Sequence, residues 1–293
     1  MERSISASRK LKRFAMHGWF GLGLIAVFWV LNWTLEGLRT HWGFFPLWLG
    51  YCLTVDALVY YRTGTSLLTR SWSKYLGLFI ISAPVWWIYE AINVRLENWV
   101  YLGSESFDPL SYTFWATLNF TSVIPAVFGS VELITSFDFM KRIPRWLIIR
   151  LNNISAAALF AFGVVSLILM LIYPHILFPF AWISLYFILE PVNYWLGFRN
   201  MENWTSKGNW KPVIALWLGV LITAFFWEMW NFFAYPKWIY QIPWGDWFRI
   251  FEMPLLGYGG YLPFALELFA LVNFVYGIFG KKNDDYVRVT PDP

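Results

Sequence analysis

PVIALWLGVLITAFFWEMWNFFA, residues 212–234, decides the class of this protein. The stretch is apolar over the ~20 residues that a membrane-spanning helix needs. It nevertheless contains a carboxylate, Glu228, and an amide, Asn231. A charged side chain near the centre of a bilayer costs ~2.5–3.5 kcal/mol on insertion scales. The sequence therefore predicts a membrane helix whose buried carboxylate has a specific partner or task.

The composition extends this prediction to the whole chain. Of its 293 residues, 58% are hydrophobic and 14% are charged, whereas soluble domains are about 25% charged. We expect an all-α, polytopic membrane protein with about eight transmembrane helices. The expected spans are residues 19–36, 44–61, 76–93, 113–136, 154–173, 178–196, 212–234 and 254–279. The basic N-terminus precedes an apolar run without a small-x-small cleavage site, so we expect a retained first helix.

Basic residues predict the orientation of the chain. With the N-terminus in the cytoplasm, 18 of the 22 lysines and arginines fall on the cytoplasmic side, and only Arg39, Arg95, Lys237 and Arg249 fall outside. We therefore expect both termini in the cytoplasm, in a bacterial inner membrane. The cytoplasmic parts are residues 1–18, a basic linker (139–153) and a tail (280–293). The net charge of +4 then reflects topology and does not indicate nucleic-acid binding.

Metal and cofactor sites are not indicated. The single cysteine, Cys52, excludes an intrachain disulfide or a thiolate cluster. His17, His41 and His175 are far apart in the sequence and are expected in loops or at helix ends. The glycines of GYGG (257–260) stand alone and favour a helix kink or close packing over phosphate binding.

Two internal similarities predict a duplication. WIYEAINVRLENWVY (87–101) aligns with FWEMWNFFAYPKWIY (226–240), so that Glu90-x-x-Asn93 matches Glu228-x-x-Asn231. After one inserted residue, the Trp-x-Tyr motif at 99–101 matches the one at 238–240. FPLWLGYCLTVDALVYYRTG (45–64) aligns with residues 178–199. We expect two four-helix repeats, residues 19–138 and 154–279, inserted in the same direction. Such parallel repeats favour a shared cavity between the halves.

Six carboxylates fall within the predicted spans: Asp56, Glu90, Glu132, Glu190, Glu228 and Glu267. They must face inward, be neutral, or find donors. A glutamate and an asparagine three residues apart share one helix face. Glu90 with Asn93, and Glu228 with Asn231, could therefore form an acid site or a polar clamp between helices, and both interpretations remain open.

Aromatic residues surround these motifs and predict an apolar, cation-stabilising cavity. We expect the wall to contain Trp86, Trp87, Trp227, Trp230, Tyr101 and Tyr240, with Asp56 and Glu190 also contributing to substrate binding. Within this cavity Glu228 or Glu90 would act as the proton donor, oriented by Asn231 or Asn93.

The sequence W-E-x-x-N, followed by W-I-Y and FRIFEMPL (227–255), resembles the lycopene cyclase domain family and, more distantly, membrane terpene cyclases. The resemblance implies two helical domains in one orientation and acid-initiated chemistry on a carotenoid or other isoprenoid. Glu90 and Glu228 match an acidic position of the family. The chain departs from the family where a proline precedes two glutamates, because Leu255 and Leu256 follow Pro254, and Ala126 and Val127 follow Pro125.

Three functions are therefore considered. The first is an isomerase or cyclase that acts on an isoprenoid or similar lipid without a cofactor. The second is a non-catalytic lipid- or pigment-binding subunit. The third is a proton-coupled transporter, which parallel repeats with buried carboxylates also fit. The expected partners are the bilayer and a hydrophobic lipid or isoprenoid substrate, together with a second copy of the chain or a membrane complex.

Overall fold

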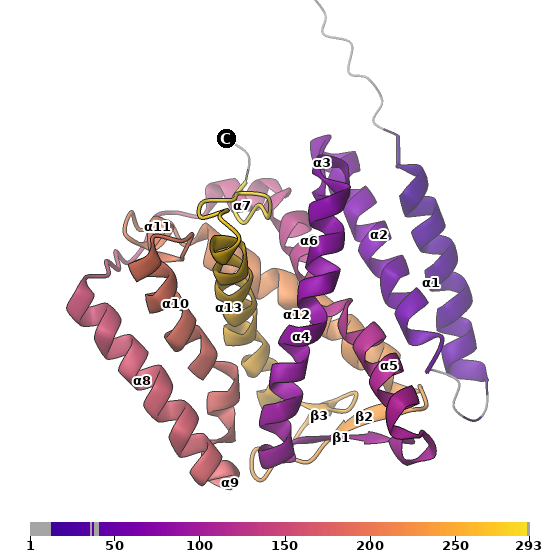
Figure 1. Ribbon diagram of the computed structural model, residues 1–293. Coiled ribbons are helices and arrows are strands. Elements are labelled where there is room, and N and C mark those ends of the chain that lie inside the picture. Colours follow the sequence, from indigo (N-terminus) through magenta and orange to yellow (C-terminus); the bar gives the residue numbers. More distant parts are fainter. Residues whose placement is uncertain (1–12, 36, 38–40, 292–293) are drawn as a thin grey trace, which may run out of the picture.

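The computed structural model describes residues 13–35, 37 and 41–291, and it is a bundle of long helices (Figure 1). Within these described residues, seven spans are long and apolar enough to cross a membrane. They are α1 (Met16–Thr34), α2 (Phe44–Thr63), α4 (Trp72–Leu96), α5 (Pro109–Phe120) with α6 (Val123–Thr135), α8 (Asn153–Ile172), α12 (Lys211–Phe232) and α13 (Leu255–Ile278). A bent pair of helices adds an eighth if it is counted as one span. The predicted all-α polytopic class is confirmed.

Short elements connect the spans at the two ends of the bundle. The short helices are α3 (Leu67–Arg70), α7 (Asp138–Arg142), α9 (Pro174–Leu177), α11 (Glu202–Thr205) and the 3₁₀ turns η1 (Ser104–Ser106) and η2 (Phe178–Trp182). The strands are β1 (Trp99–Leu102), β2 (Lys237–Tyr240), β3 (Arg249–Ile250) and β4 (Met253–Pro254). Helices α3, α7 and α11 lie at the end that carries the C-terminus, and the strands lie at the opposite end (Figure 1).

Two predicted spans are interrupted in the structure. The span predicted at 113–136 breaks at residues 121–122 into α5 and α6. Pro125 lies in the first turn of α6, where its missing N–H and its ring are tolerated, whereas a continuous helix would place the ring against the carbonyl of Thr121. The span predicted at 178–196 consists of η2 and α10 (Ser184–Leu196), and α9–η2 is bent by 41° relative to α10.

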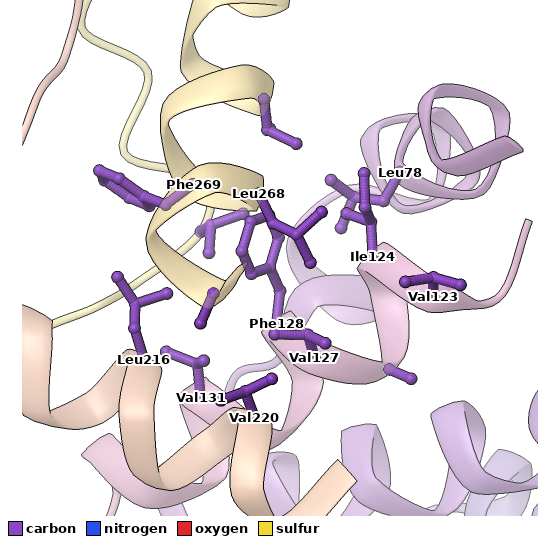
Figure 2. Packing of buried hydrophobic residues seen from close by; sticks show 14 of the residues in the cluster. Leu78, Val123, Ile124, Val127, Phe128, Val131, Leu216, Val220, Leu268 and Phe269 are labelled. Carbon is purple, nitrogen blue, oxygen red and sulfur yellow. The ribbon is translucent and has the colours of Figure 1, made fainter. Parts of the chain in front are cut away.

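The centre of the bundle is a close-packed apolar core where α6, α12 and α13 meet (Figure 2). Phe128 of α6 lies between Leu268 of α13 and Val220 of α12, and all three are almost completely buried. Gly219 allows the close approach of α12 and α6, because a Cβ there would come within 2.7 Å of the backbone of Val131. This contact joins a helix of the N-terminal half to a helix of the C-terminal half.

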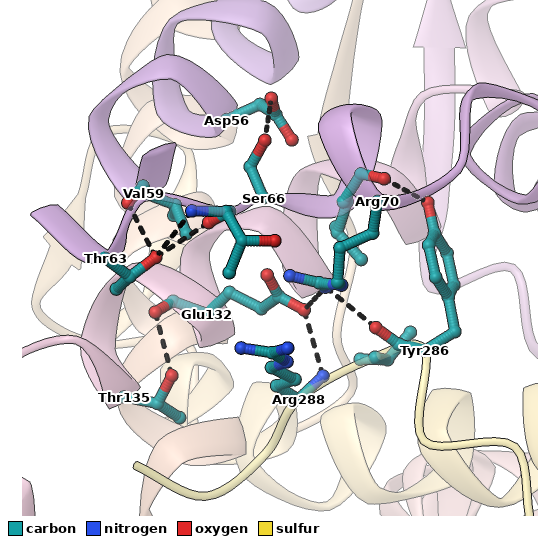
Figure 3. A network of polar contacts seen from close by, with 12 residues as sticks. Asp56, Val59, Thr63, Ser66, Arg70, Glu132, Thr135, Tyr286 and Arg288 are labelled. Atoms are coloured by element: carbon teal, nitrogen blue, oxygen red, sulfur yellow. Dashed lines mark hydrogen bonds and ion pairs between the residues drawn. The ribbon is translucent and has the colours of Figure 1, made fainter. Parts of the chain in front are cut away.

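The C-terminal segment is docked against the bundle, although the sequence had suggested only a polar tail. Arg70 forms an ion pair with Glu132 and donates to the carbonyl of Tyr286, and Glu132 also accepts the backbone N–H of Arg288 (Figure 3). Arg199 donates to the carbonyls of Asp284 and Val287. Burial lowers the pKa of Arg199 to about 10, so it remains charged at neutral pH. The segment therefore ties α3, α6 and the loop after α10 together.

Candidate functional site

Two short strands place the matched aromatic motifs of the two halves side by side. β1 pairs with β2 in antiparallel register, with Trp99 opposite Tyr240 and Tyr101 opposite Trp238. Alternate residues of a strand point to the same face, so these four aromatic side chains share one face of the β1–β2 ribbon. In the sequence alignment Trp99 matches Trp238 and Tyr101 matches Tyr240, so the register relates matched residues by a local two-fold arrangement.

Asn93 and Asn231 fix the ribbon to the helices by equivalent hydrogen bonds. Nδ2 of Asn93 donates to the carbonyl of Trp99 at 2.8 Å, and its Oδ1 accepts the backbone N–H groups of Asn98 and Trp99. Nδ2 of Asn231 donates to the carbonyl of Trp238 at 2.7 Å, and its Oδ1 accepts the Trp238 N–H at 2.9 Å. In the part of the chain that the structure describes, neither asparagine side chain is hydrogen-bonded to the glutamate of its own motif. The predicted role of both asparagines in orienting the carboxyl is thus indirect, through the strand.

Glu228 is completely buried and receives two phenol hydroxyls. Tyr240 of β2 and Tyr261 of α13 each donate to its Oε1 at 2.7 Å. Its Oε2 has no hydrogen-bond partner in the described part of the chain. Burial raises the pKa of the Tyr240 phenol well above its usual range, so this hydroxyl keeps its proton. The two tyrosines therefore connect a buried carboxyl to the aromatic face of the ribbon.

Glu90 occupies the corresponding place in the N-terminal half and has a different set of donors. Its Oε1 accepts the Tyr101 hydroxyl at 2.6 Å and the indole N–H groups of Trp86 and Trp99 at 2.9 and 3.1 Å. Glu90 is half-buried. Burial also raises the pKa of the Tyr101 phenol, which keeps its proton. Each half thus contains one tyrosine of the ribbon hydrogen-bonded to one glutamate of a long helix.

The donors to these two glutamates line a large cavity. The cavity has a volume of about 560 Å³ and lies between the β1–β2 ribbon, α5, η2 and the first turns of α13. Its wall includes Trp86, Trp99, Tyr101, Tyr240 and Tyr261. Neither Glu90 nor Glu228 is part of the lining, so both carboxyls lie behind the aromatic wall and reach the cavity through its hydroxyl and indole groups. This volume and composition fit a mostly apolar ligand.

Four of the six aromatic residues that were expected in the wall line the cavity: Trp86, Trp227, Tyr101 and Tyr240. Trp87 instead packs on Phe120, and its indole N–H donates to Thr117 at 3.0 Å. Trp230 is buried in an aromatic cluster with Trp48 and Phe226. Trp87 and Trp230 therefore stabilise helix packing, and the structure does not bring them to the cavity.

The other intramembrane carboxylates bind backbone N–H groups near the starts of helices or in the C-terminal segment. Asp56 accepts from Leu68 at the start of α3, and Glu190 accepts from Met201 just before α11. Glu267 accepts the N–H groups of Leu185 and Tyr186 in the first turn of α10, along with the Tyr89 hydroxyl. A helix start leaves four backbone N–H groups without intrahelical partners. Asp56 and Glu190, which were expected to bind substrate, lie outside the cavity lining and have this capping role.

Several cavity residues were not among the predicted site residues. They include His41, Trp99, Trp182, Trp238 and Tyr261. Trp99 and Trp238 carried a signal, because both belong to the duplicated Trp-x-Tyr motifs. No sequence pattern marks His41 or Tyr261 as a site residue, because only the fold brings the loop before α2 and the start of α13 next to the ribbon. Three glycines of GYGG (257, 259 and 260) also line the cavity, so this motif opens space in the wall.

No protein-family model, no curated protein and no solved structure matches this chain. Within the described residues, no group of three or more histidine, cysteine, aspartate or glutamate side chains is placed to hold a metal ion. Fold and site together define a class: an α-helical polytopic membrane protein with an aromatic cavity, in which buried glutamates are hydrogen-bonded to the tyrosines of the wall.

Proposed function

We propose that this protein is an integral-membrane isomerase or cyclase that acts on an isoprenoid or a similar long apolar lipid. The observation that carries the proposal is the connection of Glu228, through the hydroxyls of Tyr240 and Tyr261, to an aromatic cavity of about 560 Å³. A proton donor next to electron-rich rings suits the protonation of a double bond, because aromatic faces stabilise a cation.

The reaction needs only proton transfer. The hydroxyl of a wall tyrosine gives its proton to one carbon of a double bond, and the π electron pair forms the new C–H bond. The neighbouring carbon becomes a cation, and the glutamate behind the tyrosine replaces the lost proton. A proton from a C–H bond next to the cation then passes through a wall tyrosine to its glutamate, and the electron pair of that C–H bond forms the shifted double bond. Attack by a second double bond before this transfer gives a ring.

The surface around the cavity suits entry of a lipid. Trp244 and Leu256 belong to the wall and are also exposed, at 45% and 54%. Trp247 and Phe248, in the same loop as Trp244, are exposed as well. Tryptophan at a membrane surface prefers the interfacial region. With both termini in the cytoplasm of a bacterial inner membrane, as we propose, this opening would lie at the outer surface.

A second candidate function is a non-catalytic lipid- or pigment-binding membrane subunit. It is favoured by one observation: neither carboxyl lines the cavity, and Glu90 accepts three hydrogen bonds that hold wall residues in place. In this case the glutamates would only fix the aromatic wall. The resemblance to lycopene cyclase domains agrees with either candidate.

Lipid extraction followed by mass spectrometry separates the two candidates. Cells that supply isoprenoids would express the unmodified protein, Glu228→Gln or Glu90→Gln at equal abundance in the membrane. An enzyme gives an isomer that only the unmodified protein produces, because removal of a general acid costs ~100-fold or more in rate. Copurification of one unchanged lipid with all three proteins, without a new isomer, would contradict the enzyme and support the binding subunit.

A further inference from the structure

The two halves of the site differ in the donors around their glutamates. In the N-terminal half, Trp86 lies one helical turn before Glu90 and donates to it at 2.9 Å. The position that matches Trp86 in the aligned motif of α12 is Ala224, which is completely buried. Tyr261, which comes from α13 and has no place in the aligned motifs, donates to Glu228 instead.

This difference separates the chemistry of the two carboxyls. An indole N–H is a donor only, whereas a phenol hydroxyl both donates and accepts. Two of the three donors to Glu90 are indoles, and both donors to Glu228 are phenols. Three donated hydrogen bonds stabilise a charged carboxylate. Glu228 is fully buried. It belongs to none of the ion pairs found among residues 13–35, 37 and 41–291. Its Oε2 has no hydrogen-bond partner among those residues.

We propose that Glu228 is held as the neutral carboxylic acid and Glu90 as the charged carboxylate, which divides acid and base between the two halves. An unpaired charge in an apolar interior is costly, so the fully buried group is the neutral one. Two carboxyls in different environments can thereby take opposite roles in one reaction. The proposed charge states of Glu228 and Glu90 exist without a ligand. Only the group that receives the proton, a double bond of the ligand, rests on the proposed function.

Each proton has a defined route. Tyr240 or Tyr261, whose hydroxyl donates to Glu228 in the resting state, first turns its O–H toward the double bond, and the carboxylic acid of Glu228 then donates to that tyrosine oxygen. Glu228 passes its proton to the tyrosine oxygen while the tyrosine gives its own proton to a carbon of the double bond, and the π electron pair forms the new C–H bond. A neighbouring C–H bond then gives its proton to the Tyr101 oxygen while Tyr101 passes its proton to Glu90, and the electron pair of the broken C–H bond forms the new double bond. Return of the proton from Glu90 to Glu228 through water restores the starting state.

Infrared spectroscopy of the purified protein tests the assignment without any ligand. The carbonyl stretch of a protonated carboxylic acid is resolved by subtracting the spectrum of each variant from that of the unmodified protein. We expect Glu228→Gln to lose one such band and Glu90→Gln to lose none. Retention of every protonated band in Glu228→Gln, or loss of one in Glu90→Gln, would overturn the assignment.

If Glu228→Gln does not fold, tyrosine variants report on the infrared band of the same carboxyl group. Tyr261→Phe removes one donated hydrogen bond from Glu228, so a protonated band should shift to higher frequency, whereas Tyr101→Phe should leave that band in place. An unshifted band in Tyr261→Phe would also overturn the assignment. Lipid products are measured separately: absence of product from the unmodified protein together with the expected infrared result contradicts the proposed function alone, and product from the unmodified protein together with retention of every protonated band in Glu228→Gln contradicts the assignment alone.

Discussion

At the scale of single residues, the Glu-x-x-Asn motif combines two tasks that were expected to be one. The asparagine holds the backbone of a strand, and the glutamate holds the side chains of that strand and its surroundings. Asn231 satisfies both backbone groups of Trp238, and Asn93 does the same for Trp99. The spacing of three residues puts both side chains on one helix face, which is why one helical turn can position a whole strand.

Loss of either amide should therefore destabilise the protein to a similar extent. Asn231→Ala and Asn93→Ala leave backbone groups of the ribbon without their partners, which costs ~1–3 kcal/mol for each buried group. We expect a lower midpoint of thermal unfolding in detergent for both variants. Asn153→Ala, at an exposed asparagine in the first turn of α8, is the matched control. Equal midpoints for all three variants would contradict the role of the amides.

At the scale of elements, the start of α13 shapes the cavity because it has almost no side chains. Gly259 lines the cavity, and a Cβ at this position would meet nothing within 4 Å. Gly257 differs, since a Cβ there would come within 2.3 Å of the Met253 sulfur. Gly259 is also exposed, so a larger side chain at position 259 would extend into open space beside the cavity without displacing the wall.

Gly259→Leu should block a ligand and leave the fold intact, because leucine also favours helix more than glycine does. The probe is cis-parinaric acid, a polyene fatty acid whose fluorescence increases when its chain enters an apolar cavity. We expect at least a ~10-fold weaker apparent affinity, which corresponds to ~1.4 kcal/mol. Gly23→Leu on α1, where a Cβ also meets nothing within 4 Å, is the control for general effects on the detergent–protein particle. Unchanged binding by Gly259→Leu would place the probe elsewhere.

The sequence predicted the helices better than their interruptions. Runs of ~20 apolar residues located seven spans because the bilayer imposes that length. The breaks at residues 121–122 and at Ile183 depend on which partners receive the freed backbone groups. Glu267 of α13 accepts the N–H groups at the start of α10. No local pattern in residues 178–196 predicts a partner that lies 81 or 82 residues further along the chain.

The candidate site was predictable only in part, for a similar reason. Glu90, Glu228, Tyr101 and Tyr240 were predicted because the duplication marks them twice, whereas Tyr261, which lies outside the duplicated motifs, was not predicted. Asp56 and Glu190 were also marked twice, yet both cap short helices outside the cavity. A carboxylate in an apolar segment indicates that it has a hydrogen-bond partner. The fold determines whether that partner is a backbone N–H or a side chain in the wall of a cavity.

At the scale of the whole molecule, the two halves are joined at both ends of the bundle. The β1–β2 ribbon joins them at one end, and the C-terminal segment joins them at the other (Figures 1 and 3). Tyr286 is central to the second junction, because its ring is buried and its hydroxyl donates to the carbonyls of Leu67 and Ser71. The division into repeats at 19–138 and 154–279 stays a prediction.

Removal of the Tyr286 ring should loosen the second junction. Tyr286→Ala is expected to lower the free energy of unfolding by ~3–5 kcal/mol, as for other large buried aromatic residues. Tyr173→Ala, at a tyrosine that is 56% exposed, should change it little. Chemical unfolding in detergent, followed by tryptophan fluorescence, measures both. A change in Tyr286→Ala no larger than that of the control would mean that the C-terminal segment does not contribute to stability.

The central claim is that the aromatic cavity between the ribbon and α13 holds an apolar ligand. Electron cryomicroscopy of the protein, purified in nanodiscs from cells that supply isoprenoids and enlarged with a bound antibody fragment, tests it most directly. We predict elongated non-protein density in the cavity, in contact with Tyr240 and Tyr261, and its absence in Gly259→Leu. A cavity closed by the protein's own side chains, with lipid density only around the outside of the bundle, would contradict the claim.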